Sequence, residues 1–345
     1  MIEEKVINQV GIIYLNRPNR LNAINLAMVN QLYNILKKWE NDNNIKVILF
    51  DSLVERGFSA GGDLKEIYTD YLINDNCKDK SYLFKKEYDL DEYINSYKKP
   101  IITHWQGIVM GGGVGLTINS DFIICDENIN WAMPETSLGF VPDVGVGKYI
   151  SKLPQALGEY IGLCGVSLSS SDLVKYKLAD IATRSKDYHT LLEKLFELSN
   201  SYSGDDLINK IKREAKNFEM KQNNSTIQKN LSKINKYFSY DSMEEIVNSL
   251  KENLDDDFAL MCYQNLSKKD PFMLTIQFEK YFVGKDLTYK KTLDLDFKIV
   301  QYAIRTKAIH EGIRAKIIDK DNNPKWPHSS FNEVSINKVK DLLLS

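Results

Sequence analysis

The stretch that decides the fold is residues 100–115, which read PIITHWQGIVMGGGVG. Apolar and β-branched residues over Pro100–Val109 predict a buried strand, and Gly111–Gly113 predict a tight turn at its end. From Val114 to Ser120 the pattern becomes that of a helix start. A strand that passes through a glycine-rich turn into a helix is typical of layered α/β structure. Such a turn also lets the backbone come close to a ligand.

The same alternation of strand and helix patterns continues on both sides of this stretch. Val6–Leu15 is rich in β-branched residues and predicts a strand, as do Lys46–Phe50 and Phe122–Cys125. Leu26–Glu40 carries apolar residues at helical spacing and predicts a helix. We therefore predict an α/β layer structure for the first half of the chain.

The second half of the chain has a different character. Residues 186–260 show helical patterns rich in Lys, Glu and Asn, with loops predicted at Asn223-Asn224 and Asp255–Asp257. We predict two domains, a core over residues 1–185 that carries the functional site and a mainly helical region over residues 186–345.

Composition excludes several classes of protein. The 345 residues are 43% hydrophobic and 27% charged, which is typical of a globular protein, and the formal net charge is −2. That balance gives no reason to expect a nucleic-acid partner, whose binding needs many Lys and Arg contacts to phosphate. The four cysteines and four histidines show no metal-ligand spacing, and His104 is predicted to be a hydrogen-bonded core residue.

The N-terminus and the apolar runs indicate no membrane segment. Glu3 and Glu4 do not fit a basic secretory or mitochondrial leader, and the apolar run at 107–118 is short and contains five glycines. We expect a cytoplasmic protein, with a mitochondrial location only if a leader has been removed.

Three segments are candidates for chemistry: residues 58–63 (FSAGGD), 107–115 and 133–145. Two glycine turns that aim backbone N–H groups at one carbonyl oxygen would form an oxyanion hole. Either turn alone is explained as well by close packing of strand and helix. Neither matches a nucleotide-phosphate motif.

Glu135 and Asp143 lie eight residues apart in a stretch rich in Pro and Gly. Two acids beside an oxyanion hole can divide the work, since one attacks or takes a proton while the other orients or donates. Each acid alone has a simpler explanation, because Pro-Glu-Thr often starts a helix and Pro-Asp often forms a turn. The combination is what favours catalysis.

Taken together, these motifs resemble the enoyl-CoA hydratase/isomerase, or crotonase, superfamily, and more closely its acyl-CoA hydrolase branch. The resemblance covers nearly the whole chain. The segments that carry it are 15–23 (LNRPNRLNA), 60–63 (AGGD), 97–100 (YKKP), 110–116 (MGGGVGL), 133–136 (MPET), 139–145 (GFVPDVG) and 311–326 (EGIRAKIIDKDNNPKW).

The resemblance implies a crotonase-like (ClpP/crotonase) fold of repeated ββα units and a small-molecule acyl-CoA thioester as substrate. It places the oxyanion hole at the backbone N–H groups of Gly62 and Gly112. It also implies that backbone groups at Ala60 and Asp63–Leu64 hold the CoA moiety. Arg20 is the expected contact to the CoA phosphates, with Arg17 as the alternative. A surface role for these arginines is an equal alternative.

The pattern of acids separates the branches of this superfamily. Hydratases carry a first catalytic glutamate just after the triple glycine, where this chain has Gly115, and a second at the position of Glu135. Asp143 supplies the second acid at the position that the hydrolase branch uses, and Glu87 matches an acidic substrate contact of that branch. A simpler explanation for Glu87 is a solvated charge on a Lys-rich helix.

The resemblance therefore implies hydrolysis of a short-chain 3-hydroxyacyl-CoA, with 3-hydroxyisobutyryl-CoA of valine catabolism as the expected substrate. Glu135 is either the nucleophile or the general base. No cofactor or metal is expected, because CoA belongs to the substrate. Hydratase or isomerase activity and a non-catalytic, ribosome-associated role are the alternatives. A homo-oligomer is expected from the superfamily, unless the helical C-terminal region covers that interface.

Overall fold

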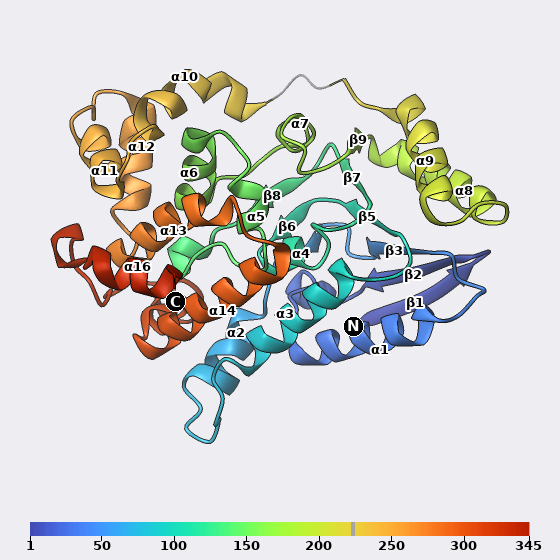
Figure 1. The fold of residues 1–345 in the computed structure, drawn as a ribbon, viewed down its shortest axis with the longest axis horizontal. Coiled ribbons are helices and arrows are strands. Elements are labelled where there is room, and N and C mark those ends of the chain that lie inside the picture. The colour runs from blue at the N-terminus through green and yellow to red at the C-terminus, as the bar shows by residue number, and fades with distance from the viewer. Residues whose placement is uncertain (222–224, 345) are drawn as a thin grey trace. The chain divides into compact units, whose positions relative to one another are not determined.

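The computed structural model describes residues 1–221 and 225–344. Contacts between residues divide the chain into two compact units, each assembled from three stretches, and Figure 1 shows their elements. The first unit contains Met1–Gly62, Asp89–Trp131 and Ser167–Ile227. The second contains Asp63–Tyr88, Ala132–Val166 and Gln228–Ser345. The predicted loop at Asn223-Asn224 lies outside the described residues.

A six-stranded sheet forms the centre of the first unit. Its strands run in the order β1-β2-β3-β5-β7-β9, and every neighbouring pair except β1 and β2 is parallel. Their bounds are β1 Ile2–Ile7, β2 Val10–Leu15, β3 Val47–Ser52, β5 Ile101–Trp105, β7 Phe122–Asp126 and β9 Ile181–Thr183. Runs such as VILFDS in β3 are buried throughout, which is the pattern of strands covered on both faces.

The predicted strand Val6–Leu15 is wrong as a single element. The chain turns at Asn8-Gln9 and forms the antiparallel pair β1–β2. Asn8 adopts a left-handed φ of 52°, which asparagine tolerates better than most residues. The predicted strand Pro100–Val109 is also broken, because Gly107, with φ 50°, separates β5 from β6.

Helices cover the six-stranded sheet of the first unit. The predicted helix at Leu26–Glu40 is confirmed as α1, whose N-terminus is capped by Asn25, and its Trp39 packs against Gly11 of β2. Helices α8 (Ser185–Ser199) and α9 (Gly204–Ala215) share one apolar core with the strands (Figure 1). His104 in β5 is buried and contacts Asp51 through Nδ1, as predicted for a core residue.

A second sheet of three short strands carries the glycine turns. Its order is β4-β6-β8, with bounds β4 Gly57–Ser59, β6 Ile108–Met110 and β8 Asn130–Ala132. The helix after β6, α4, spans Gly112–Gly115 and therefore begins two residues earlier than predicted. Both predicted turns thus lie at the carboxyl ends of neighbouring parallel strands, β4 and β6.

The second unit is mainly helical. Its longest elements are α13 (Pro271–Gly284) and α14 (Tyr289–Arg305), and α13 is buried along most of its length. Its other elements are α2 Leu64–Glu66, η2 Ile67–Leu72, η3 Glu135–Leu138, α5 Gly147–Ile150, α6 Gln155–Cys164, α10 Thr226–Phe238, α11 Met243–Lys251, α12 Asp257–Leu266, α15 Ala308–Ile313, η5 Arg314–Ile318, η6 Phe331–Glu333 and α16 Ile336–Leu344. Helix α3, Tyr82–Asn95, begins in this unit.

The helical character of the second half is confirmed, since the last strand of the described chain ends at Thr183. The domain boundary at residue 185 stays a prediction. None of the helices among residues 1–221 and 225–344 is long and apolar enough to cross a membrane. The cysteines of the described chain are free thiols, and all but Cys77 are buried.

Candidate active site

The two glycine turns lie against each other within the first unit. Gly61 has a φ of 90°, and a Cβ atom at this position would lie 3.0 Å from Met110 O and 3.4 Å from the backbone nitrogen of Gly112. Only a residue without a side chain allows this approach. The backbones of the two turns therefore pack directly against each other at Gly61, Met110 and Gly112.

The Ser59 side chain holds the first glycine turn through hydrogen bonds. Its hydroxyl donates to Asn22 O at 3.0 Å and accepts from Gly61 N at 3.2 Å, and it packs against Gly113 of the second turn. In the described part of the chain, no hydrogen bond occupies the N–H of Gly62 or of Gly112. Both groups are thus free to donate to a ligand, which is the requirement of an oxyanion hole.

Three acidic side chains are buried in the second unit. Glu87 on α3, Glu135 at the start of η3 and Asp143 in the following loop are each no more than 5% exposed. Among described residues, Glu87 Oε1 and Glu135 Oε2 are buried without a hydrogen-bond partner. Buried carboxyl groups with unused hydrogen-bonding capacity are costly, so they mark a place where a ligand is expected.

Helix α3 supplies the neighbour that contacts Asp143. Tyr88 follows Glu87, and its hydroxyl donates to Asp143 Oδ2 at 2.5 Å. The Tyr88 ring packs edge-on against Phe297, and Phe84 packs in the same way against Phe140. The carboxyl groups therefore lie among aromatic rings, where a small acyl group would be shielded from water.

A buried ion pair supports the loop that carries Asp143. Lys280 of α13 pairs with Asp296 of α14, and both side chains are at most 2% exposed. Lys280 Nζ also donates to Pro142 O at 2.5 Å, and Asp296 Oδ2 accepts from Gly145 N at 2.9 Å. The pair thus holds the backbone on both sides of Asp143.

The conformation of this loop is unusual. Val144 has a φ of 51°, in the left-handed region that valine rarely adopts, and Tyr289 donates to its carbonyl at 3.2 Å. Gly145 has a φ of 76°, and a Cβ atom there would lie 2.1 Å from the Tyr289 ring. Strain of this kind is kept only where surrounding contacts impose it, and it is frequent at functional sites.

Comparison with known proteins identifies the family. A family model described as enoyl-CoA hydratase/isomerase matches residues 10–343. The chain belongs to the enoyl-CoA hydratase/isomerase family. It is accordingly a crotonase-family acyl-CoA enzyme with the α/β crotonase fold that the sequence predicted.

Two named relatives of this family member carry the same name. The bovine (Bos taurus) protein named "3-hydroxyisobutyryl-CoA hydrolase, mitochondrial" is 34% identical over 338 residues, which cover 97% of this chain and 86% of the relative. The human (Homo sapiens) protein of the same name is 33% identical over 330 residues, covering 94% of this chain and 83% of the relative.

Two solved structures share the whole fold but carry other titles. A carnitinyl-CoA dehydratase from Mycobacterium thermoresistibile has a TM-score of 0.87 and 26% identity, covering 100% of this chain and 96% of that structure. An enoyl-CoA hydratase from Rhodobacter sphaeroides has the same TM-score and 27% identity, covering 99% of this chain and 97% of that structure.

Burial raises the pKa of each acid of this crotonase-family site. Burial, together with the charge of Asp143, raises the pKa of Glu87 to about 8. Burial also raises the pKa of Glu135 well above its ordinary value, again helped by Asp143. The pKa of Asp143 is raised to about 7, mainly by burial and against the hydrogen bond from Tyr88. With pKa values of about 8 and about 7, Glu87 and Asp143 change protonation near neutral pH, which suits acid–base work.

The structure brings the sequence-predicted acids together within the second unit. Asp63 is buried and caps α2, where its side chain accepts from Glu66 N at 3.2 Å. Ala60 and Leu64 are half-buried, and Arg20 is an exposed residue of the short turn at 18–20. Arg17 instead donates to Ala23 O at 2.7 Å and so supports its own loop.

Sequence reasoning missed Tyr88, Lys280 and Asp296. A signal for Lys280 was present, because it stands in the apolar run PFMLTIQFEKYF of α13, where a buried lysine needs an acidic partner. Nothing in the sequence indicated which of the 47 acidic residues that partner is. The pairing depends on how α13 packs against its neighbours in the folded unit.

Proposed function

We propose that this protein hydrolyses a short-chain 3-hydroxyacyl-CoA thioester, with 3-hydroxyisobutyryl-CoA as the substrate. The observation that carries the proposal is the buried cluster of Glu87, Glu135 and Asp143 in a chain with Gly115 where hydratases of this family have a glutamate. The relatives named 3-hydroxyisobutyryl-CoA hydrolase support the choice of substrate.

The proposed reaction uses the glycine turns as an oxyanion hole. The N–H groups of Gly62 and Gly112 hold the thioester carbonyl oxygen as negative charge grows on it. Glu135, once deprotonated, attacks the carbonyl carbon, the C–S bond breaks, and CoA leaves as a thiolate that takes a proton from solvent. Water then cleaves the mixed anhydride and releases the hydroxy acid.

In a second route, to which we give the same weight, Glu135 acts as a general base. It then takes a proton from the water that attacks the carbonyl, and the proton passes on to the departing sulfur. In both routes Asp143 and Glu87 hold the β-hydroxyl of the substrate and the attacking water. Backbone groups at Ala60, Asp63 and Leu64 hold the CoA moiety, and the exposed Arg20 contacts its phosphates.

The test is release of free thiol from (S)-3-hydroxyisobutyryl-CoA by the wild type and by Glu135→Gln. The wild type should release CoA, and the substitution should lower kcat by about a hundredfold or more, since Gln neither attacks nor accepts a proton. Full activity in Glu135→Gln would reject both routes. Isotope labelling with ¹⁸O-water in a single turnover identifies the anhydride route if label appears in the Glu135 carboxylate, because the general-base route places ¹⁸O in the hydroxy acid alone.

Hydration is the second candidate, because the two structures with a TM-score of 0.87 are titled dehydratase and hydratase. Adding water across a double bond needs an acid and a base at neighbouring carbons, and Gly115 removes one of the usual pair. Mass spectrometry of an incubated enoyl-CoA distinguishes the reactions. Free CoA indicates hydrolysis, whereas a gain of one water with CoA retained indicates hydration.

A non-catalytic, ribosome-associated role is disfavoured by the buried acids. Three carboxyl groups inside one unit reduce stability, and a protein without a substrate gains nothing from them. Co-sedimentation with ribosomes at low salt would support that role. The cytoplasmic location and homo-oligomeric state expected from the sequence stay predictions.

A further inference from the structure

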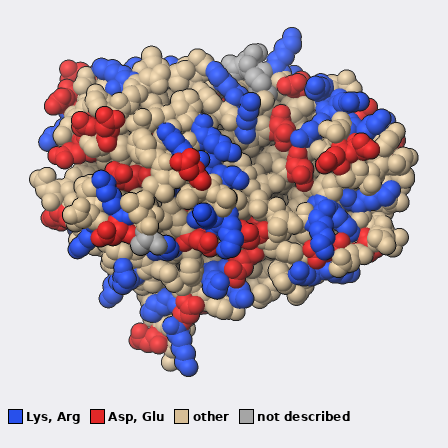
Figure 2. Space-filling model, in the orientation of Figure 1, with Lys and Arg blue, Asp and Glu red and all other residues tan. Residues whose placement is uncertain are grey.

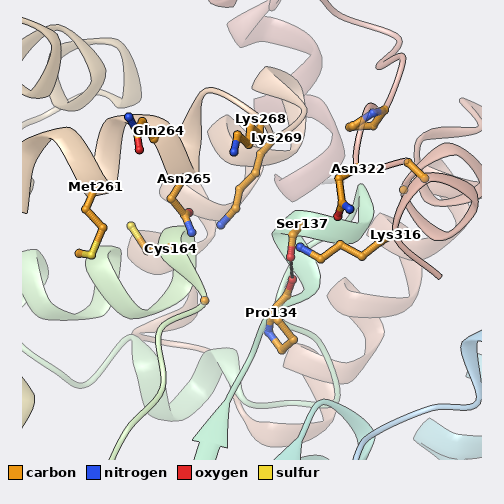
Figure 3. Close-up of a pocket in the computed structure, with 14 residues that line it drawn as sticks. Pro134, Ser137, Cys164, Met261, Gln264, Asn265, Lys268, Lys269, Lys316 and Asn322 are labelled. Carbon is orange, nitrogen blue, oxygen red and sulfur yellow. Dashed lines mark hydrogen bonds between the residues drawn. The ribbon is translucent and has the colours of Figure 1, made fainter. Parts of the chain in front are cut away.

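A cavity of about 550 Å³ lies entirely within the second unit, outside the cluster of acids (Figure 3). Its wall is formed by the η3 turn at Pro134 and Ser137, the end of α6, helix α12 and the segment from α15 through η5 to Pro324. This volume is in the range of small-molecule sites, which is roughly 300–1,000 Å³.

The lining of this cavity is basic. Lys268, Lys269 and Lys316 contribute to the wall, whereas no aspartate or glutamate does. Figure 3 shows the side chains of Lys269 and Lys316 entering from different elements, with the amide of Asn322 beside Lys316. Elsewhere on the molecule the balance differs, since acidic and basic side chains are interspersed over the face in Figure 2.

Lys269 is the central observation. It is only 4% exposed, and its Nζ donates to Thr136 Oγ1 at 2.9 Å and to Leu163 O at 2.5 Å. None of the ion pairs within 4.0 Å found among the described residues includes Lys269. An ammonium has three hydrogens, so two neutral acceptors leave both a donor and the positive charge unmatched.

The electrostatics agree with room for an anion. Burial is the main cause that lowers the pKa of Lys269 to about 8; the charge of Lys316 lowers it further, whereas Cys164, Cys262 and Glu135 offset only part of this. A buried cation without a counter-ion is unfavourable, and a second cation nearby makes it more so. An anion in the cavity would relieve both effects.

We propose that this cavity binds a phosphate group, held by Lys269 and Lys316 and assisted by the exposed Lys268. Phosphate matches two or three ammonium groups in charge, and the Asn322 amide, which gives one hydrogen to Lys320 O, has a second hydrogen to donate. The phosphate belongs either to the CoA moiety of the substrate or to a separate phosphate ester. The inference rests on the acyl-CoA chemistry of the family, and it does not require hydrolysis.

A ligand in this cavity would affect the η3 turn, which begins at Glu135. Lys269 bonds Thr136, which directly follows Glu135, and Ser137 of the same turn lines the cavity. A phosphate that draws the Lys269 ammonium toward itself would change the hydrogen bond by which Lys269 holds Thr136 in η3. We therefore expect a bound phosphate to stabilise the second unit.

The experiment is calorimetric titration of the full chain with inorganic phosphate, with CoA and with 3′-dephospho-CoA, none of which is turned over. Lys316→Gln should weaken binding of phosphate or CoA by about tenfold, as expected for loss of one charged hydrogen bond. The matched control is Lys298→Gln, an exposed lysine on α14 outside the cavity, which should change binding less than about twofold.

The ligands distinguish the two sources of phosphate. Phosphate that is displaced by saturating CoA, with a Lys316-dependent difference between CoA and 3′-dephospho-CoA, identifies the substrate's own phosphate. Phosphate that still binds in saturating CoA identifies a separate ligand. The proposal is overturned if wild type and Lys316→Gln bind each of the three ligands with the same affinity. It is also overturned if neither protein binds any of them.

Lys269→Met supplies a second readout, the melting temperature in rising phosphate at constant ionic strength set with chloride. The wild type should be stabilised by phosphate, and Lys269→Met should not be. No gain in the wild type counts against the site. If the wild type releases no thiol but its binding of phosphate or CoA depends on Lys316, the proposed hydrolysis alone is rejected. If it releases thiol but its binding does not depend on Lys316, this site alone is rejected.

Discussion

Three carboxyl groups at 87, 135 and 143 set the chemistry at the scale of single residues. Burial raises the pKa of each group, and the charge of Asp143 raises the pKa values of Glu87 and Glu135 further. The cluster therefore carries fewer negative charges at neutral pH than three ordinary carboxylates would. This arrangement leaves one group to act as base or nucleophile while another remains protonated and donates a hydrogen bond.

The raised pKa of Glu87 has a consequence for stability. Between the ordinary pKa of a glutamate and about 8, folded protein keeps a proton at Glu87 that unfolded protein has lost, so the contribution of Glu87 to stability falls as pH rises. Glu87→Gln should thus raise the free energy of unfolding by about 1–3 kcal/mol at pH 8.5 and by much less near pH 5.

Urea unfolding of wild type and Glu87→Gln at both pH values measures this difference. The matched control is Glu55→Gln, an exposed glutamate in the first unit, which should show no such dependence on pH. A Glu87→Gln effect that is equal at the two pH values would contradict the assignment of a buried, protonated Glu87.

At the scale of elements, α13 and α14 hold the loop between η3 and α5. Lys280 and Asp296 are buried together, and between them they bind Pro142 O and Gly145 N. Gly145 cannot carry a side chain because Tyr289 of α14 fills the adjacent space. Val146, next to Gly145, is fully buried, so the loop accommodates its side chain by packing.

Removing one partner of this ion pair should be more harmful than removing both. Lys280→Met leaves Asp296 charged and buried and should cost about 3–5 kcal/mol of stability, whereas the double variant Lys280→Met/Asp296→Asn should cost less. Chemical denaturation of the two variants checks the order.

Enzyme kinetics separate support of the loop from a purely structural role. Loss of the Lys280 charge raises the pKa of Asp143 and Glu135 further, since Lys280 lowers both. The acidic limb of kcat/KM should then move to higher pH in the folded fraction of Lys280→Met. An unchanged pH profile would mean that Lys280 does not act on the acids.

At the scale of the whole molecule, the charge is close to balanced. The formal net charge is −2, and the visible face in Figure 2 shows no large patch of one sign. A chain of this kind does not steer a polyanionic CoA ester from a distance. Recognition of the phosphates must come from short-range contacts of particular basic residues.

This balance predicts a weak dependence of the association step on salt. Raising NaCl from about 0.05 to about 0.2 M should raise KM for the acyl-CoA by no more than about threefold, because a nearly balanced charge leaves little long-range attraction for salt to screen. The matched substrate is the N-acetylcysteamine thioester of the same acid, which carries no phosphate and should show no salt effect. A tenfold rise in KM for the CoA ester would indicate long-range steering instead.

The sequence by itself determined the family, the crotonase fold, helix α1, the helical second half and the three acids that cluster. These features follow from local signals, namely periodicity, glycine turns and motifs of fixed spacing. It misjudged the strands at 6–15 and 100–109, because a turn of only two residues inside an apolar run leaves little trace in composition.

Tertiary structure alone decided the rest. It paired Lys280 with Asp296, placed Tyr88 on Asp143 and left Lys269 buried among neutral acceptors. It also shifted the pKa values of the acids, since burial exists only once distant segments have packed together. Each of these depends on contacts between residues far apart in the chain, and sequence patterns report only on near neighbours.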